Sequence, residues 1–320
     1  MKRYTLSSMG FPRSGAVDAA TVPGLDAQSR RGPLHAALVT LRPKQWIKNV
    51  LVIAAAGAAG ALGADDVPFR VGVAFVAFCM LASGIYAVND VRDREEDRRH
   101  PRKRRRPIAA GELEPSSALV LGFALMLGGL VLCAAVRPLL LVVGLGYLAL
   151  TLTYTMVWRR LPVLDIVAIA GGFVLRAVAG GVAAPVTLSR WFIVVVTFSA
   201  LLVAAGKRLA ELGRAEREDA VKRRVLHFYT AARLRLLITG SAACALFSYC
   251  VWAFGLPTVN GFPWRPLTIL PFAACLARYG ALVQRGDGEA PEEMLLHDRP
   301  LQLAGAAWLV VFVLGLRALS

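Results

Sequence analysis

Long apolar stretches separated by short, strongly basic segments constrain the fold of this 320-residue chain more than any other feature. A soluble core cannot bury so many runs of this length, whereas about 20 apolar residues span the hydrocarbon core of a bilayer. The composition agrees, because 57% of the residues are hydrophobic and 18% are charged, against roughly 25% charged in an average globular domain. The sequence therefore predicts an all-α polytopic membrane protein and excludes a soluble one.

The apolar runs predict about nine transmembrane helices, an odd number that places the two termini on opposite sides of the membrane. The predicted spans are 46–64, 68–89, 116–136, 138–158, 163–183, 190–209, 234–255, 265–283 and 301–318. The first 33 residues contain no apolar core of signal-peptide length. We therefore predict a disordered cytoplasmic tail over 1–33 and a membrane-embedded domain over 34–320.

The formal net charge of +16 is distributed unevenly over the predicted loops. Lys and Arg concentrate in the clusters 92–106 and 207–235, on the same side as the N-terminus. Because Lys and Arg are retained in cytoplasmic loops, this side is predicted to be cytoplasmic. Topology alone, or attraction to anionic lipid head groups, also accounts for much of the surplus. We predict membrane lipids, and no nucleic acid, as partners of this surface.

Acidic side chains at helical spacing follow the second predicted span. At 100° per residue from Asn89, Asp93 lies at about 40°, Asp97 at about 80° and Asp90 at about 100° around the helix. Carboxylates held this close repel one another unless a cation lies between them, and oxygen ligands of this kind suit Mg²⁺. Glu96 lies just outside the arc. The alternative is a solvated, salt-bridged loop of mixed charge.

Two further groups of ionisable residues lie in or beside the predicted spans. Asp165 and Arg176 are nearly in phase on the span 163–183, and Arg176 falls at membrane depth, where a charge should face the protein interior or a wet cavity. Lys44 and Lys48 flank Trp46 at the entry to the first span. Snorkelling anchors beside an interfacial Trp would have the same pattern.

Two sequence motifs resemble a known family. The segment "NDVRDREED" resembles the NDxxDxxxD motif of the UbiA superfamily of intramembrane prenyltransferases, and "HPRKRRRPIAAG" resembles its HPxKxxRPIAxG continuation. The resemblance implies a UbiA-type helical bundle with an active cavity on the cytoplasmic side. It also implies Mg²⁺, held on a diphosphate by Asn89, Asp90, Asp93 and Asp97, with the three aspartates as catalytic residues.

The segments "LRPKQWIKN", "LDIVAIAGGFVLRAVAGG" and "AAGKRLAEL" resemble a narrower, actinobacterial branch of the superfamily. This resemblance implies an Mg-dependent pentosyltransferase of the bacterial inner membrane. Such an enzyme moves 5-phosphoribosyl from phosphoribosyl diphosphate to decaprenyl (polyprenyl) phosphate and releases diphosphate, in a precursor step for cell-wall arabinan. A homo-oligomer is left open.

The resemblance, together with the membrane depth of Arg176, predicts a set of substrate-binding residues, most of them basic. They are Lys44, Lys48, Asn89, Lys103, Arg106, Tyr154, Arg159, Arg160, Asp165, Arg176, Lys207 and Arg208. The chain departs from most of the superfamily after the sixth span, where Lys207, Arg208 and Glu211 replace a second aspartate motif. A cationic pair suits a lipid monophosphate better than a second magnesium site would. These two cations could also simply mark the cytoplasmic end of the span.

Two other functions remain open from the sequence. One keeps the fold and uses a prenyl diphosphate donor with an aromatic acceptor. The other is a transporter or a lipid-binding scaffold, although a transporter should show internal repeats and ionisable residues near the midplane, and no clear repeat is visible. The last basic-side loop, "APEEMLLHDRPLQ", receives no predicted role.

Overall fold

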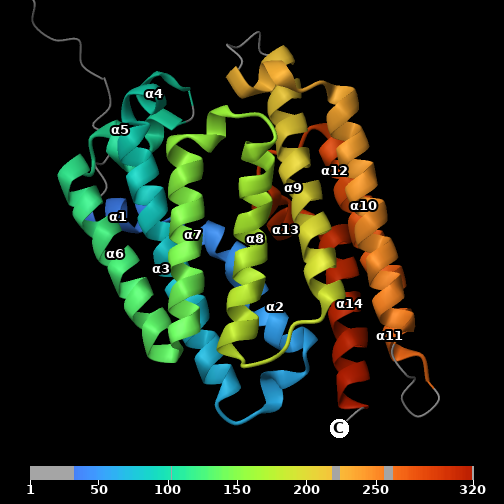
Figure 1. The fold of residues 1–320 in the computed structure, drawn as a ribbon. Coiled ribbons are helices and arrows are strands. Elements are labelled where there is room, and N and C mark those ends of the chain that lie inside the picture. Colours follow the sequence, from blue (N-terminus) through green and yellow to red (C-terminus); the bar gives the residue numbers. More distant parts are fainter. Residues whose placement is uncertain (1–31, 102, 218–223, 256–261, 319–320) are drawn as a thin grey trace, which may run out of the picture.

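The computed structural model describes residues 32–101, 103–217, 224–255 and 262–318, and within these ranges the chain folds mainly into helices joined by short loops (Figure 1). The α-helices are α1 (Pro33–Leu41), α2 (Val50–Ala58), α3 (Val67–Arg92), α4 (Arg94–Arg99), α5 (Pro107–Ala110), α6 (Pro115–Val136), α7 (Pro138–Met156), α8 (Leu164–Ala183), α9 (Arg190–Arg217), α10 (Ala231–Phe254), α11 (Trp264–Leu267), α12 (Ile269–Arg285), α13 (Pro291–His297) and α14 (Arg299–Arg317). The 3-10 turns are η1 (Pro43–Asn49), η2 (Ala61–Gly63), η3 (Lys103–Arg105), η4 (Trp158–Arg160) and η5 (Arg224–Phe228). Of the predicted tail, residues 1–31 lie outside the described residues, and Pro33 already begins α1.

Within the described residues, eight helices are long and apolar enough to cross a membrane, which confirms the predicted polytopic fold. They are α3, α6, α7, α8, α9, α10, α11 with α12, and α14. The first predicted span, 46–64, was wrong as a single helix. The chain there forms η1, the nine-residue α2 and η2, because Gly60 adopts a φ of +71° and turns the backbone out of the helix.

The spans alternate in direction, so their connections gather at two ends of the bundle (Figure 1). One end carries α4, α5, η3, η4, η5 and α13, and we call it the basic end because it includes the predicted basic clusters. Helices α3, α7, α9 and α12 run toward this end, and α6, α8, α10 and α14 leave it. Residues far apart in the sequence are thereby brought together at one level.

Local sequence signals explain where several of these helices begin. Proline occupies the first turn of α6, α7 and α14, where its missing N–H is not needed. The Asp298 side chain also caps α14 by accepting a hydrogen bond of 2.9 Å from the Leu301 N–H. The same carboxylate binds the Arg278 guanidinium of α12, with Nη2 2.7 Å from Oδ2. This contact fixes α12 against the start of α14.

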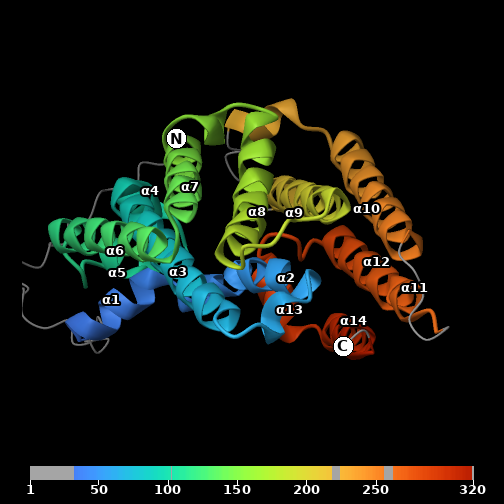
Figure 2. The same cartoon turned by 60° about the horizontal axis from the view of Figure 1, so that its bottom comes forward.

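Two apolar clusters make up the interior. One contains Phe78, Leu81 and Leu140 from α3 and α7, and the other contains Leu202, Leu234 and Val283 from α9, α10 and α12. Figure 2 shows the corresponding groups of helices on either side of α2, α8 and α13. The bundle is therefore built from two packed halves, with the segments that prove important for the site between them.

Gly180 allows α8 to touch the backbone of α2. A Cβ added at this position would lie 2.0 Å from the carbonyl oxygen of Val52. We therefore expect Gly180→Ala to force the two helices apart and to destabilise the protein by about 1–3 kcal/mol or more. Thermal unfolding in detergent measures this loss. Gly146→Ala on α7 is the matched control, because a Cβ there meets nothing within 4 Å. Equal melting temperatures for the two variants would contradict the prediction.

Candidate active site

Two of the predicted acidic residues share an arginine at the basic end. Asp90 and Asp97 are only 3% and 1% exposed. Arg106 donates to both through Nη1, at 3.1 Å from Asp90 Oδ1 and 2.6 Å from Asp97 Oδ2. Arg42, which precedes η1, also pairs with Asp90. The buried carboxylates are thus held together and neutralised by guanidinium groups from two different segments.

The third predicted aspartate has a separate partner. Arg159 of η4 donates through Nη1 to both oxygens of Asp93, at 3.0 and 2.9 Å. The hydrogen bonds to Asp93 raise the pKa of Arg159, although burial acts in the opposite direction. The predicted arc assumed a continuous helix through Asp97, but α3 ends at Arg92 and α4 begins after Asp93. Asp93 lies at this interruption, and its carboxylate pairs with Arg159 of η4.

The oxygen donors around Asn89 fit a hard cation in chemistry, and Asn89 Oδ1 is buried without a hydrogen-bond partner. Across the described residues, however, no group of three or more His, Cys, Asp or Glu side chains has the spacing of a metal site. The predicted ligands lie on one short stretch of chain, with Asp90 and Asp97 bridged by Arg106. Glu96, the predicted helper, is exposed on α4.

The turn after α4 places cations beside this acidic group. Lys103 begins η3, and its backbone N–H donates to His100 Nδ1 at 3.3 Å. Burial lowers the pKa of His100, and the charge of Lys103 lowers it further, so the imidazole is neutral at pH 7. Lys103 and Arg106 are both half-buried at this position. They border the same end of the bundle as Asp90 and Asp97.

The predicted cationic pair on α9 separates into two environments. Arg208 is 1% exposed, and it donates to Asp165 Oδ2 at 2.6 Å and to the Tyr154 hydroxyl at 3.0 Å. It also pairs with Glu211 on its own helix. Lys207 is half-buried and has no ion pair with any described residue. The structure therefore holds Arg208 against protein carboxylates and leaves Lys207 without one.

Arg176 lies buried in the membrane-spanning part of α8, as its predicted depth required, and is 6% exposed. Its guanidinium donates to Asn49 Oδ1 at 2.7 Å, to the Gly172 carbonyl at 2.8 Å and to the Tyr147 hydroxyl at 2.6 Å. All three acceptors are neutral. Asp165, eleven residues earlier in the sequence, contacts Arg208 instead.

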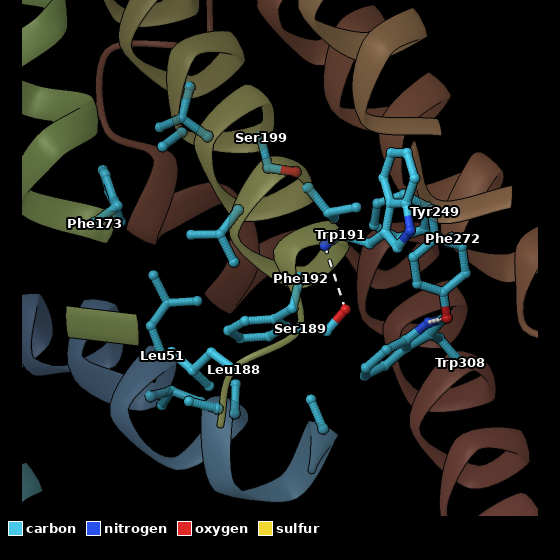
Figure 3. Close-up of a pocket in the computed structure, with 18 of the residues that line it drawn as sticks. Leu51, Phe173, Leu188, Ser189, Trp191, Phe192, Ser199, Tyr249, Phe272 and Trp308 are labelled. Carbon is cyan, nitrogen blue, oxygen red and sulfur yellow. Dashed lines mark hydrogen bonds between the residues drawn. The ribbon is translucent and has the colours of Figure 1, made fainter. Parts of the chain in front are cut away.

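A cavity of about 740 Å³ lies between α2, α8, α9 and α14. Figure 3 shows Leu51, Phe173, Phe192 and Trp308 around it, and the lining is mainly aliphatic and aromatic. Among the described residues that line it, the charged ones are Lys48 and Glu292. The cavity is therefore an apolar chamber with one ionic group at its wall.

The ionic group at the cavity joins η1 to α13. Lys48 Nζ lies 3.1 Å from Glu292 Oε2, and Gln45 Nε2 donates to Glu292 Oε1 at 2.5 Å. Burial would raise the pKa of Glu292, but the Lys48 charge and the Gln45 hydrogen bond hold it below its ordinary value. The ion pair therefore stabilises the fold above the ordinary carboxyl pKa of about 4.3, and this stabilisation is lost as the pH falls through the lowered value.

The sequence predictions missed Glu292, Gln45 and Arg42, and the loop that contains Glu292 received no predicted role. Two predicted substrate residues, Lys44 and Arg160, are exposed at the surface. The other predicted residues divide among the acidic group at Asp90, the Asp93–Arg159 pair, the buried network of Arg208, the cavity wall, Arg176 and the separate Lys207.

Comparison with known proteins agrees with this architecture. The UbiA prenyltransferase family matches residues 50–313. A decaprenyl-phosphate phosphoribosyltransferase of Corynebacterium glutamicum is 43% identical over 304 residues, which cover 91% of this chain and 90% of the relative. The Mycolicibacterium smegmatis enzyme of the same name is 41% identical, over 91% of this chain and 96% of its own. A UbiA homologue from Archaeoglobus fulgidus, solved bound to GPP and Mg²⁺, superposes with a TM-score of 0.67 and 17% identity, over 88% of this chain and 99% of its own.

The helical bundle and the acidic group at one end define an intramembrane transferase, and this chain belongs to the UbiA prenyltransferase family. Within that family it is similar, over nine-tenths of its length, to the two decaprenyl-phosphate phosphoribosyltransferases.

Proposed function

We propose that this protein transfers the 5-phosphoribosyl group of phosphoribosyl diphosphate to the phosphate of a polyprenyl phosphate, decaprenyl phosphate in particular, and releases diphosphate. The names of the two relatives that match most of the chain support this reaction. The structural observation that carries it is a large apolar cavity with Lys48 at its wall, in a bundle whose basic end holds Asp90 and Asp97. A lipid tail and a polar donor need these two environments.

The sugar donor is assigned to the acidic group. Mg²⁺ held by Asn89, Asp90, Asp93 and Asp97 would neutralise charge on the departing diphosphate. Lys103 and Arg106 lie beside these residues and bind diphosphate oxygens. Arg106 already bridges Asp90 and Asp97, so its guanidinium is positioned next to the leaving group before the donor arrives.

The acceptor needs no activating base. A phosphate monoester carries about 1.5 to 2 negative charges at pH 7, so its oxygen can attack C1 of the ribose directly as the bond to diphosphate lengthens. The C1–O bond to the lipid phosphate forms while the C1–O bond to diphosphate breaks, with inversion at C1. No Ser, Cys or Lys nucleophile is required. The chain contributes by holding the two anions in line and by excluding water.

The different solubilities of the two substrates determine where they meet. The polyprenyl tail occupies the apolar cavity, while the donor enters from the aqueous phase at the basic end, whose charge attracts it. The positive-inside rule makes this end cytoplasmic, in a bacterial plasma membrane. If the reaction takes place where these two environments meet, the lipid tail stays in the apolar cavity and the sugar donor stays in water.

A product assay tests this proposal against the alternative donor. Purified protein is incubated with a polyprenyl phosphate and phosphoribosyl diphosphate, with and without Mg²⁺, and the lipid is weighed by mass spectrometry. We expect a lipid that has gained one phosphoribosyl group, and only when Mg²⁺ is present. A parallel reaction contains a short prenyl diphosphate and an aromatic acceptor. A prenylated aromatic product together with an unchanged polyprenyl phosphate would contradict the proposal.

A further inference from the structure

The helix α13 places a carboxylate at the wall of the apolar cavity. Glu292 is 8% exposed, and its neighbours Pro291 and Leu295 also line the cavity. Gln45 donates to its Oε1, whereas Oε2 receives no hydrogen bond and makes only the ion pair with Lys48. Burying a carboxylate beside an apolar chamber costs free energy unless it is paired and hydrogen-bonded, and here Lys48 and Gln45 supply both contacts. Neither the acidic group nor the proposed donor site uses it.

Positive charge exceeds negative charge in this part of the protein. Lys48 lines the cavity, and Asn49, the next residue, accepts a hydrogen bond of 2.7 Å from Arg176. Arg176 lies behind the wall, with its guanidinium carbon 5.7 Å from the centre of the Phe173 ring. Its hydrogen-bond partners are neutral, so Glu292, which pairs with the half-buried Lys48, is the one carboxylate among the described residues that line the cavity. An environment of this kind attracts a further anion.

We propose that Lys48 is the residue that contacts the acceptor's phosphate and that Glu292 is a displaceable counter-ion, which releases Lys48 when the phosphate arrives. This inference rests on the proposed function, because it takes a polyprenyl phosphate as the ligand of the cavity. Arg176 is a positioning residue in this scheme: it raises the electrostatic potential behind Lys48 without touching the lipid.

In the absence of a bound lipid, Lys48 needs a counter-ion. Without Glu292, Lys48 would be a cation beside an apolar chamber, and desolvation would favour its neutral form. Burial lowers the pKa of Lys48, and the Glu292 charge offsets part of that effect while holding Nζ 3.1 Å from Oε2 at the cavity wall. The arriving phosphate must compete with a carboxylate already bound, which limits how tightly the charged lipid is held. A diester product, which is still anionic, leaves more readily for the same reason.

The same arrangement gives specificity for charge. An uncharged polyprenol fills the apolar chamber as well as its phosphate does, but it cannot replace Glu292 at Lys48. Removing the carboxylate charge therefore changes the affinity for the phosphate and leaves the affinity for the alcohol unchanged. A purely structural role for Glu292 would affect both lipids equally, because both need the intact chamber.

The test compares Glu292→Gln with Glu293→Gln in the full-length protein. The two substitutions remove the same charge from the same helix, but Glu293 is exposed. Equilibrium binding is measured with polyprenyl phosphate and with the matching polyprenol. Glu292→Gln is expected to bind polyprenyl phosphate about tenfold more tightly, because one like-charge repulsion is lost. Its affinity for polyprenol, and its KM for phosphoribosyl diphosphate, are expected to equal those of the wild type and of Glu293→Gln.

A double variant, Lys48→Gln with Glu292→Gln, keeps the chamber free of unpaired charge and provides the second measurement. It is expected to bind polyprenyl phosphate more weakly than the wild type and no better than polyprenol. The inference is overturned if Glu292→Gln shifts both lipids alike, or shifts neither, in a protein that still forms the phosphoribosyl lipid. A wild-type protein that forms no such lipid overturns the proposed function itself, and the inference with it.

Discussion

Asp97→Asn is expected to lower the rate of phosphoribosyl transfer by about 10³-fold, a loss typical of removing one group that stabilises charge in a transition state. Asp97 is 1% exposed, and Arg106 Nη1 lies 2.6 Å from its Oδ2. The asparagine has the same shape, so the fold is retained while the charge is removed. Both the proposed cation and Arg106 lose their anionic partner.

Initial rates with a radiolabelled sugar donor, measured over a series of Mg²⁺ concentrations, test this expectation. The variant should need more Mg²⁺ for half of its maximal rate, as well as being slower. Glu95→Gln and Glu96→Gln are the controls, since both glutamates are exposed on α4, the helix that carries Asp97. Rates for Asp97→Asn within a few-fold of these controls would remove Asp97 from the site.

The second large effect concerns stability. Arg208→Met is expected to destabilise the protein by about 3–5 kcal/mol, the cost of leaving a buried charge without its partner. Asp165 is fully buried, and it would lose the guanidinium that lies 2.6 Å from its Oδ2. Tyr229 would remain as its hydrogen-bond donor, at 2.5 Å from Oδ1. One neutral donor cannot compensate for a lost ion pair.

Thermal unfolding in detergent measures this change. Lys207→Met is the matched control for stability, because Lys207 is adjacent in sequence, half-buried and without an ion pair among the described residues. Asp165→Asn combined with Arg208→Met should recover part of the loss, since the fully buried position 165 then carries no charge. Equal melting temperatures for Arg208→Met and Lys207→Met would contradict a structural role for the buried pair.

Patterns within short stretches of sequence predicted much of this molecule. The apolar runs predicted the spans because each run crosses a bilayer by itself, and α3 and α14 lie within a few residues of their predicted positions. The depth of Arg176 followed from its place within a run. The first span was wrong because a glycine-rich run satisfies hydropathy without sustaining a helix, as Gly60 shows.

Contacts between distant segments could not be predicted in the same way. Arg208 was expected to pair with a lipid phosphate, but Asp165, 43 residues away, occupies it. Glu292 reaches Lys48 across more than 200 residues of sequence. Helical periodicity says which face a side chain occupies, and not which helix packs there. Asp93 shows the same limit, because its partner Arg159 lies 66 residues away in the sequence.

The short α2 has a consequence for how the protein is made. Nine helical residues extend about 13 Å, less than half of the roughly 30 Å hydrocarbon layer. Such a segment has little tendency to enter a bilayer unaided. In the folded protein α2 packs against α8 at Gly180. This part of α8 is synthesised more than a hundred residues after α2. We therefore expect α2 to pack into its final position only after α8 has inserted, although α2 precedes α8 in the sequence.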